Sequence, residues 1–249
     1  MYVPVFSLMP FHRRRIDSEA PAGSIMRIIL GVLSLCFVLT APAQAAGQAV
    51  IQTEQNGQVE QTRMVWLTDR AVRMDITHPP AEVLLHQNAL YAISDLGGLS
   101  VVASVASVDQ LAQALGQGAG VFNQLNREMA QSVRRFEAMG HQETVAGIRG
   151  EQYRVVWVDQ QGATHTDVAV LSHAPEVVEL TKALQNMALA ANKGNDARMA
   201  EFLSKGWGIL RYGRIYRIDS ITGNSPEPSL LALPTQSIDV QGILQRLSR

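Results

Sequence analysis

The side chains best suited to chemistry in this chain include one close pair of an acid and a histidine, His165-Thr166-Asp167. In an alternating strand the two outer residues of such a triplet point to the same face. An imidazole beside a carboxylate can act as a general base or bind a metal ion. Because no other reactive group converges on it in the sequence, we favour the simpler interpretation of a solvent-facing polar pair.

Other spacings typical of enzymes do not occur in the sequence. The five histidines after Met26 form no His-Glu-x-x-His motif, which would place two metal ligands and a base on one helical face. No serine stands in a Gly-x-Ser-x-Gly elbow, and no glycine-rich phosphate loop is present. We therefore expect a protein that is not an enzyme, with no catalytic residue, metal or cofactor.

Residues 26–45, MRIILGVLSLCFVLTAPAQA, have the three-part layout of a secretory signal peptide. A basic Arg27 precedes a short apolar core, and Ala43-Gln44-Ala45 forms a small-x-small cleavage site. The apolar run is well short of the roughly 20 residues that a transmembrane helix requires. We expect cleavage after Ala45, which leaves 46–249 as a single domain without a membrane span.

Residues 1–25 precede this signal and are interpreted as an upstream, mis-assigned extension, with Met26 as the initiator. In the alternative, Met1 is the start and Arg13–Arg15 belong to a long twin-arginine signal, but two acids and a proline separate these arginines from the apolar core. A lipid anchor on Cys36 is disfavoured, because bulky Leu35 stands where a small residue is needed.

Composition narrows the classes of function open to the mature chain. Removing residues 1–45 takes four of the 21 basic and two of the 22 acidic residues, leaving 17 basic and 20 acidic ones. A net charge near −3 argues against a nucleic-acid partner. Cys36 is the single cysteine and leaves with the signal, which excludes disulfides and thiol chemistry. The short, arginine-led signal indicates a bacterial periplasm.

The first part of the mature chain predicts six strands joined by short turns. Asn56-Gly57 lies between two β-like runs and is a strong hairpin signal, because both central residues of the tight turn need a positive φ. Further reversals are expected at Asp69-Arg70 and Gln87-Asn88. In the third strand Val72, Met74 and Ile76 share one face, so that face should be buried.

The middle of the chain predicts a helical insertion in two pieces. Ser107 to Gln110 has the spacing of a capping box, which marks a helix start. Apolar residues then recur at three- and four-residue spacing, which predicts a helix from Val121 to Phe136. Three glycines lie between the two pieces and should form a lid hinge, since each costs about 1 kcal/mol in a helix: Gly116, Gly118 and Gly120.

The remainder alternates between strands and a second helix. Strands are expected up to about Ile148, from Tyr153 to Asp159 and from Thr164 to Leu171. A helix should begin at Pro175, and after a polar patch one long strand should cover 206–223. A closing strand over 229–240 and a helix near 243–247 end the chain. The predicted fold class is α+β, with a curved antiparallel sheet (half-barrel) covered by helical insertions.

This order of elements resembles the periplasmic lipoprotein carriers, the LolA-like and LolB-like unclosed β-barrels with a helical lid, and related exported proteins. The likeness rests on MVWLTDRAVRMDI with its Arg73-Met74-Asp75 triplet, on ETVAGIRGEQYRV, and on SLLALPTQSIDV. The chain departs from the LolB-like pattern in lacking a lipidated cysteine, and it has an additional segment over 192–207. The resemblance implies an apolar pocket between the sheet and the helices.

We therefore expect an exported periplasmic, non-enzymatic protein that binds a lipid or a lipoprotein acyl chain in a half-barrel cavity. The alternative is an envelope protein–protein interaction module with a filled core and no ligand. The two hypotheses differ in whether the space between the sheet and the helices is an open cavity or a filled core. The candidate pocket-lining residues are Val65, Trp66, Met74, Tyr91, Phe122, Leu125, Met129 and Trp157.

Overall fold

A computed structural model describes most of the chain after the expected cleavage site. The expected signal, the helix start at 107–110, the glycines Gly116, Gly118 and Gly120, the pocket candidates Phe122 and Leu125, and the terminal helix all lie outside the described residues. The chain divides into two units, 1–43 and 44–249, and the description concerns the second. The described residues are 46–55, 57–77, 80–96, 99–105, 129–191, 194–235 and 237–239.

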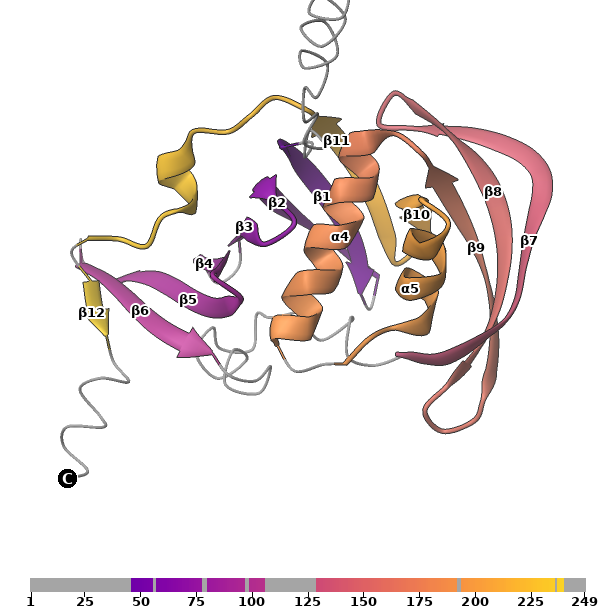
Figure 1. Cartoon of the computed structure of the whole chain (residues 1–249), viewed down its shortest axis with the longest axis horizontal. Helices are drawn as coiled ribbons and strands as arrows, with labels where there is room; N and C mark the ends of the chain where they lie inside the picture. Colours follow the sequence, from indigo (N-terminus) through magenta and orange to yellow (C-terminus); the bar gives the residue numbers. More distant parts are fainter. Residues whose placement is uncertain are drawn as a thin grey trace, which may run out of the picture. The chain divides into compact units, whose positions relative to one another are not determined.

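The described residues form one twelve-stranded sheet, shown in Figure 1. Its order is β12-β6-β5-β4-β3-β2-β1-β11-β10-β9-β8-β7, and every neighbouring pair is antiparallel except β12 with β6. Within the described residues β12 and β7 are the two ends, so the sheet is curved but unclosed. The strands are β1 (Gly47–Gln55), β2 (Gln58–Thr68), β3 (Ala71–Ile76), β4 (Ala81–His86), β5 (Ala89–Leu96), β6 (Leu99–Val105), β7 (Ala130–Val145), β8 (Ile148–Asp159), β9 (Thr164–Ser172), β10 (Gly208–Tyr212), β11 (Tyr216–Thr222) and β12 (Ser237–Asp239).

The six strands predicted for the first part of the domain are confirmed, and so are the reversals at Gly57, Asp69-Arg70 and Gln87-Asn88, as far as their residues are described. Gly57 has a φ of 76° between β1 and β2. Gln87 and Asn88 have φ values of 50° and 64° between β4 and β5, the left-handed pair that a two-residue hairpin turn requires. Strand β3 buries Val72, Met74 and Ile76 as expected.

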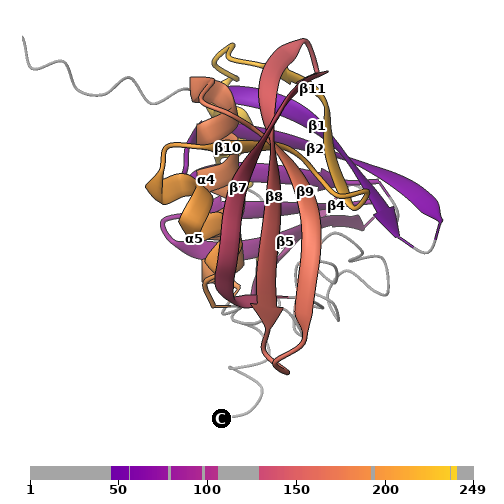
Figure 2. The same ribbon diagram turned by 90° about the vertical axis from the view of Figure 1, so that its right-hand side faces the viewer.

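Within the described residues, two α-helices pack against one face of the sheet, which we call the inner face (Figure 2). Helix α4 (Pro175–Ala190) begins at the predicted proline and buries the predicted stripe, including Leu180, Leu184 and Met187. Helix α5 (Ala197–Ser204) was not predicted, and it lies where a polar patch without regular structure was expected. Its N-cap is Asp196, whose carboxylate accepts a hydrogen bond from the backbone N–H of Arg198.

The predicted helix from Val121 to Phe136 is wrong over its last seven residues, which belong to strand β7. The register of β7 on β8 shifts between Ala130 and Ser132 and again between Val133 and Arg135. Each bulge adds one residue, so Ala130, Val133 and Phe136 reach the core at a spacing of three. A doubly bulged strand therefore carries the apolar spacing of a helix.

Two predictions for the last part of the chain also need correction. The long strand expected over 206–223 is the hairpin of β10 and β11, which reverses near Gly213 with its φ of 54°. The strand expected over 229–240 is a short 3₁₀ helix, η2 (Pro228–Leu231), followed after a few residues by β12. These two corrections replace predicted strand by a turn and a 3₁₀ helix, but the described residues remain mostly β, because β7 takes the place of the end of a predicted helix.

Apolar side chains gather on both faces of the sheet. The larger core joins the inner face to α4 and α5 and contains Trp66, Trp157 and Phe202. A smaller cluster on the opposite, outer face contains Val65 and Leu84 and is covered by Leu231 of η2. The two helices and the η2 segment thus cover different faces of the sheet (Figure 1). The candidate site is a cavity on the inner face.

Candidate functional site

A cavity of about 120 Å³ lies between the inner face of the sheet and helices α4 and α5. Its wall is mainly apolar, and its volume approaches the roughly 150 Å³ of an engineered cavity that accepts benzene. The space therefore fits one ring or a short alkyl segment. The apolar side chains that line it are Ile51, Met74, Met129, Leu184, Ala188, Met199, Phe202, Ile209 and Ile215.

Three methionines from distant parts of the sequence meet at this cavity. Met74 comes from β3, Met129 directly precedes β7, and Met199 belongs to α5. Alternation along β3 points Met74 inward, whereas the cap at Asp196 fixes the start of α5 and hence the position of Met199. Methionine side chains are flexible and adapt to irregular apolar partners, so this wall can change shape with little cost.

Arg198 forms the polar end of the cavity together with Asp196. Its Nε and Nη2 atoms donate to the two carboxylate oxygens of Asp196 at 3.0 and 2.6 Å, a bidentate pair. The guanidinium also lies 4.0 Å from the ring centroid of Trp157. Burial lowers the pKa of Arg198, but the hydrogen bonds and charge of Asp196 outweigh burial and raise it overall. Arg198 therefore stays charged and paired.

Asp167 anchors the aromatic residues behind this arginine. Its Oδ2 atom accepts hydrogen bonds from Trp157 Nε1 at 2.7 Å and from the Tyr212 hydroxyl at 2.8 Å. Burial raises the pKa of Tyr212, and Asp167 acts in the same direction, against the opposing effect of Arg198. The phenol of Tyr212 is consequently a fixed donor to Asp167.

His165 and Asp167 do not form the solvent-facing polar pair that the sequence favoured, because Asp167 accepts hydrogen bonds from Trp157 and Tyr212. His165 Nε2 instead lies 2.8 Å from Asp159 Oδ2, and its ring stacks on Trp157 with 4.3 Å between centroids. The His165 hydrogen bond is the main cause of a lowered pKa for Asp159. Among the described residues no group of three or more His, Cys, Asp or Glu side chains could hold a metal ion.

Tyr216, a residue of the cavity wall, has a hydroxyl in an unusual state. The oxygen is buried and has no hydrogen-bond partner among the described residues. Burial raises the pKa of Tyr216, so the phenol stays protonated. Leaving a buried hydroxyl unsatisfied costs about 1–3 kcal/mol, and most buried side-chain polar atoms in native proteins are paired. Tyr216 is therefore a residue of the cavity wall whose buried donor has no partner in the described structure.

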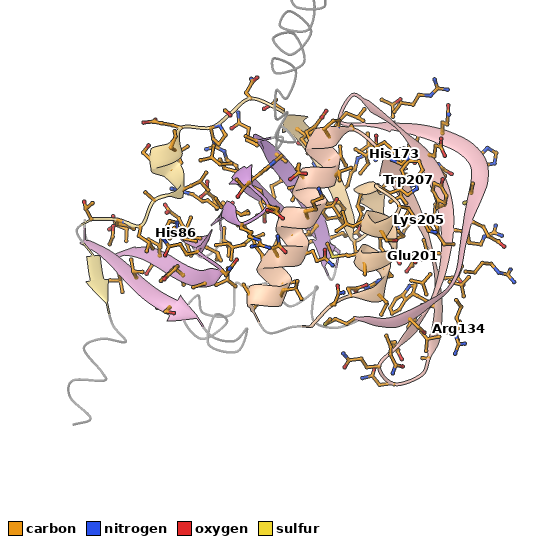
Figure 3. The ribbon with its side chains drawn as sticks, in the orientation of Figure 1. His86, Arg134, His173, Glu201, Lys205 and Trp207 are labelled. Atoms are coloured by element: carbon orange, nitrogen blue, oxygen red, sulfur yellow. The ribbon has the colours of Figure 1, made fainter. Side chains whose placement is uncertain are left out.

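A chain of aromatic rings connects the cavity to the protein surface. Phe202 of α5 contacts Phe136, which stacks on Tyr153 with 4.4 Å between centroids. Tyr153 then contacts Trp207, and Trp207 stacks on His173 at 3.5 Å. Figure 3 shows His173 and Trp207 together, beyond the end of α5 that carries Lys205. These rings brace α5 against strands β7 and β8.

The predicted pocket residues divide into three groups. Met74 and Met129 line the cavity. Trp66 and Trp157 are buried in the same inner core without lining it, and Trp157 lies behind Arg198. Val65 and Tyr91 belong to the cluster on the outer face, so their predicted position was wrong. The cause is strand alternation, since Val65 neighbours inward-facing Met64 and Trp66.

Sequence reasoning missed the polar residues of the site. Asp196 and Arg198 were assigned to a polar patch, although the Asn-Asp-Ala-Arg run before an apolar-periodic stretch is a usable helix-start signal. Tyr212 and Tyr216 were placed on one continuous strand. Between them lies Gly213, the turn glycine that brings the two tyrosines opposite each other.

Comparisons with known proteins find a few solved structures that are distantly similar to this one. No protein-family model matches the chain, and no match appears among curated proteins. The crystal structure of MucB in complex with MucA(peri) aligns with 14% identity and a TM-score of 0.29, covering 80% of this chain and 56% of that one. The Pseudomonas aeruginosa MucA/MucB complex aligns with 12% identity and a TM-score of 0.30, covering 80% and 59%.

A structure of MucB alone aligns with 14% identity and a TM-score of 0.28, covering 78% of this chain and 59% of that one. This chain therefore spans less than two thirds of the length of the chains it matches. At these TM-scores the likeness defines neither a ligand nor a partner, so the proposals below rest on the residues of this chain. Among the described residues, no helix has the length and apolar character needed to cross a lipid bilayer.

Proposed function

We propose that this protein is an exported, periplasmic, non-enzymatic binding protein whose ligand is an apolar molecule, held between α4, α5 and the inner face of the sheet. The observation that carries the proposal is the apolar cavity with its three flexible methionine side chains. The signal-like segment at 26–45 supports export. A lipid or a lipoprotein acyl chain is the ligand class that we favour.

The size of the cavity sets how such a ligand would enter. At about 120 Å³ it accommodates a ring or a short stretch of acyl chain, so a longer chain requires the wall to move. Helix α5 has only eight residues, and its apolar side is held by Met199 and Phe202. We propose that displacement of α5, with rearrangement of the methionines, enlarges the space for a longer chain.

The alternative, an envelope interaction module with a filled core, has less support. Such a module would present a contiguous apolar patch to its partner. The large apolar side chains exposed among the described residues come from three separate elements: Val59 of β2, Leu189 of α4 and Ile215 of the turn between β10 and β11. The cavity is therefore a better candidate for the functional site than the outer surface.

Native mass spectrometry of the protein purified from the periplasm tests this proposal. We expect a stoichiometric bound molecule that organic extraction releases and that proves to be a lipid or another apolar compound. A mass equal to that of the bare chain, together with no binding of a fluorescent naphthylamine probe, would contradict the proposal. That result would direct attention to a protein partner instead.

A further inference from the structure

The two tyrosines of the β10–β11 hairpin lie opposite each other and both reach the cavity wall, but their hydroxyls differ in one respect. The Tyr212 hydroxyl donates to Asp167 at 2.8 Å. The Tyr216 hydroxyl is buried and has no hydrogen-bond partner among the residues the structure describes. The hydroxyl of Tyr212 thus has a partner within the fold, whereas the hydroxyl of Tyr216 is an unpaired, buried donor on a residue of the cavity wall.

The charges around the cavity limit what that occupant can be. Among the described residues that line it, the charged ones are Asp196 and Arg198, and these two bind each other in a bidentate pair. Asp167 lies behind them and contributes a further negative charge. A ligand carboxylate would therefore meet a site that is net negative and whose arginine is already paired. An uncharged acceptor oxygen meets no such repulsion.

We propose that the apolar ligand carries an uncharged carbonyl oxygen, as an acyl ester does, and that the Tyr216 hydroxyl donates a hydrogen bond to it. The inference rests on the proposed function and narrows its ligand class. Free fatty acids and plain hydrocarbons are then poorer ligands than esters of the same chain length. Because burial raises the pKa of Tyr216, the phenol remains a donor throughout the ordinary pH range.

The structure also predicts how removal of this hydroxyl affects the unliganded protein. Tyr216→Phe removes a buried polar atom that has no partner in the described structure, so it should leave the urea midpoint of the unliganded protein unchanged or raise it. Tyr212→Phe is the matched control, because it removes one of the two hydrogen-bond donors to Asp167 Oδ2. The control should lower the midpoint.

The preference for an ester can be measured directly. A fluorescent naphthylamine probe is bound to the protein and then displaced by methyl octanoate, octanoate or octane. We expect the wild-type protein to bind methyl octanoate about 5-fold more tightly than octane, the value of one neutral hydrogen bond, and more tightly than octanoate. In Tyr216→Phe the ester should lose this advantage while the affinity for octane stays the same. A merely structural role for Tyr216 would weaken all three ligands together.

The outcomes separate this inference from the proposed function. If octane and the ester bind equally well to the wild-type protein, or if Tyr216→Phe keeps the preference for the ester, the inference is overturned and the apolar-binding function stands. If octanoate binds more tightly than the ester, the charge argument is overturned. If neither the probe nor any of the three compounds binds the wild-type protein, the proposed function and the inference fail together.

Discussion

Glu143 of β7 joins four strands through a single carboxylate. Its two oxygens accept hydrogen bonds from Nε and Nη2 of Arg211 in β10 at 3.0 and 2.8 Å. Gln152 of β8 donates to it at 3.1 Å, and Arg217 of β11 lies 3.7 Å away. Because β7 and β11 are not neighbours in the sheet, this carboxylate supports the curvature that encloses the cavity.

Replacing this carboxylate by an amide should produce a pH-dependent loss of stability. The hydrogen bond from Arg211 is the main cause of a pKa for Glu143 below its ordinary value of 4.5. A lowered folded-state pKa contributes stability above the unfolded-state pKa, and this contribution is lost as pH falls through the folded-state value. Glu143→Gln should therefore cost about 1–2 kcal/mol of unfolding free energy at neutral pH.

Urea unfolding of both proteins at neutral pH and at about pH 3 checks this prediction. The difference between wild type and Glu143→Gln should shrink at the lower pH, since the wild-type carboxyl is then becoming protonated. Glu137→Gln on the same strand is a control, because its pair with Arg135 is longer, at 3.5 Å, and exposed. An equal loss for Glu143→Gln at both pH values would show that its charge is not responsible.

At the scale of single residues, the sequence could predict only part of the site. Met74 was found because alternation along a short, regular strand fixes its direction. The same reasoning failed for Val65 and Tyr91, since strand parity had to be chosen without knowing which face the helices cover. The unpaired state of the Tyr216 hydroxyl follows from the hairpin and the helices together, so no local pattern could reveal it.

At the scale of elements, β10 and α4 are packed so closely that their contact depends on a glycine. A Cβ atom added to Gly208 would lie 2.4 Å from the carbonyl carbon of Val177 and 2.5 Å from the backbone nitrogen of Val178. Beside it, the backbone N–H of Ile209 donates to Thr181 Oγ1 at 2.9 Å. The helix that roofs the cavity is thereby fixed to the sheet.

Gly208→Ala should consequently destabilise the domain by at least about 2 kcal/mol, because backbone atoms cannot move aside as a side chain can. Gly223→Ala is the control, since nothing lies within 4 Å of the position where its Cβ would stand. Thermal unfolding followed by circular dichroism measures both. If the two variants melt at the same temperature, the close approach of α4 to β10 is contradicted.

The elements that the sequence predicted well are those whose signals are local. The hairpin turns at 56–57 and 87–88 and the proline start of α4 each depend on a few adjacent residues. Strand β7 was mistaken for a helix because its bulges exist only in pairing with β8. Helix α5 was missed because eight residues give too short a periodic pattern.

At the scale of the whole described domain, the two faces of the sheet serve different purposes. The outer face is covered by η2 and holds a small apolar cluster. The inner face holds the larger core, within which α4, α5 and the sheet leave an apolar space. A mainly apolar cavity forgoes packing contacts that a filled core would gain. A ligand in this space would recover those contacts, in keeping with the proposed function.

Two neighbouring residues of α4 allow this central claim to be tested by filling the cavity. Ala188 lines the cavity, whereas Leu189 is 43% exposed on the outer side of the helix. The measurement is titration of the fluorescent naphthylamine probe into the wild type, Ala188→Trp and Leu189→Trp, with circular dichroism to confirm that each is folded. We predict at least about a 10-fold weaker affinity for Ala188→Trp and an unchanged affinity for Leu189→Trp. Equal probe affinity in all three folded proteins would contradict binding in this cavity.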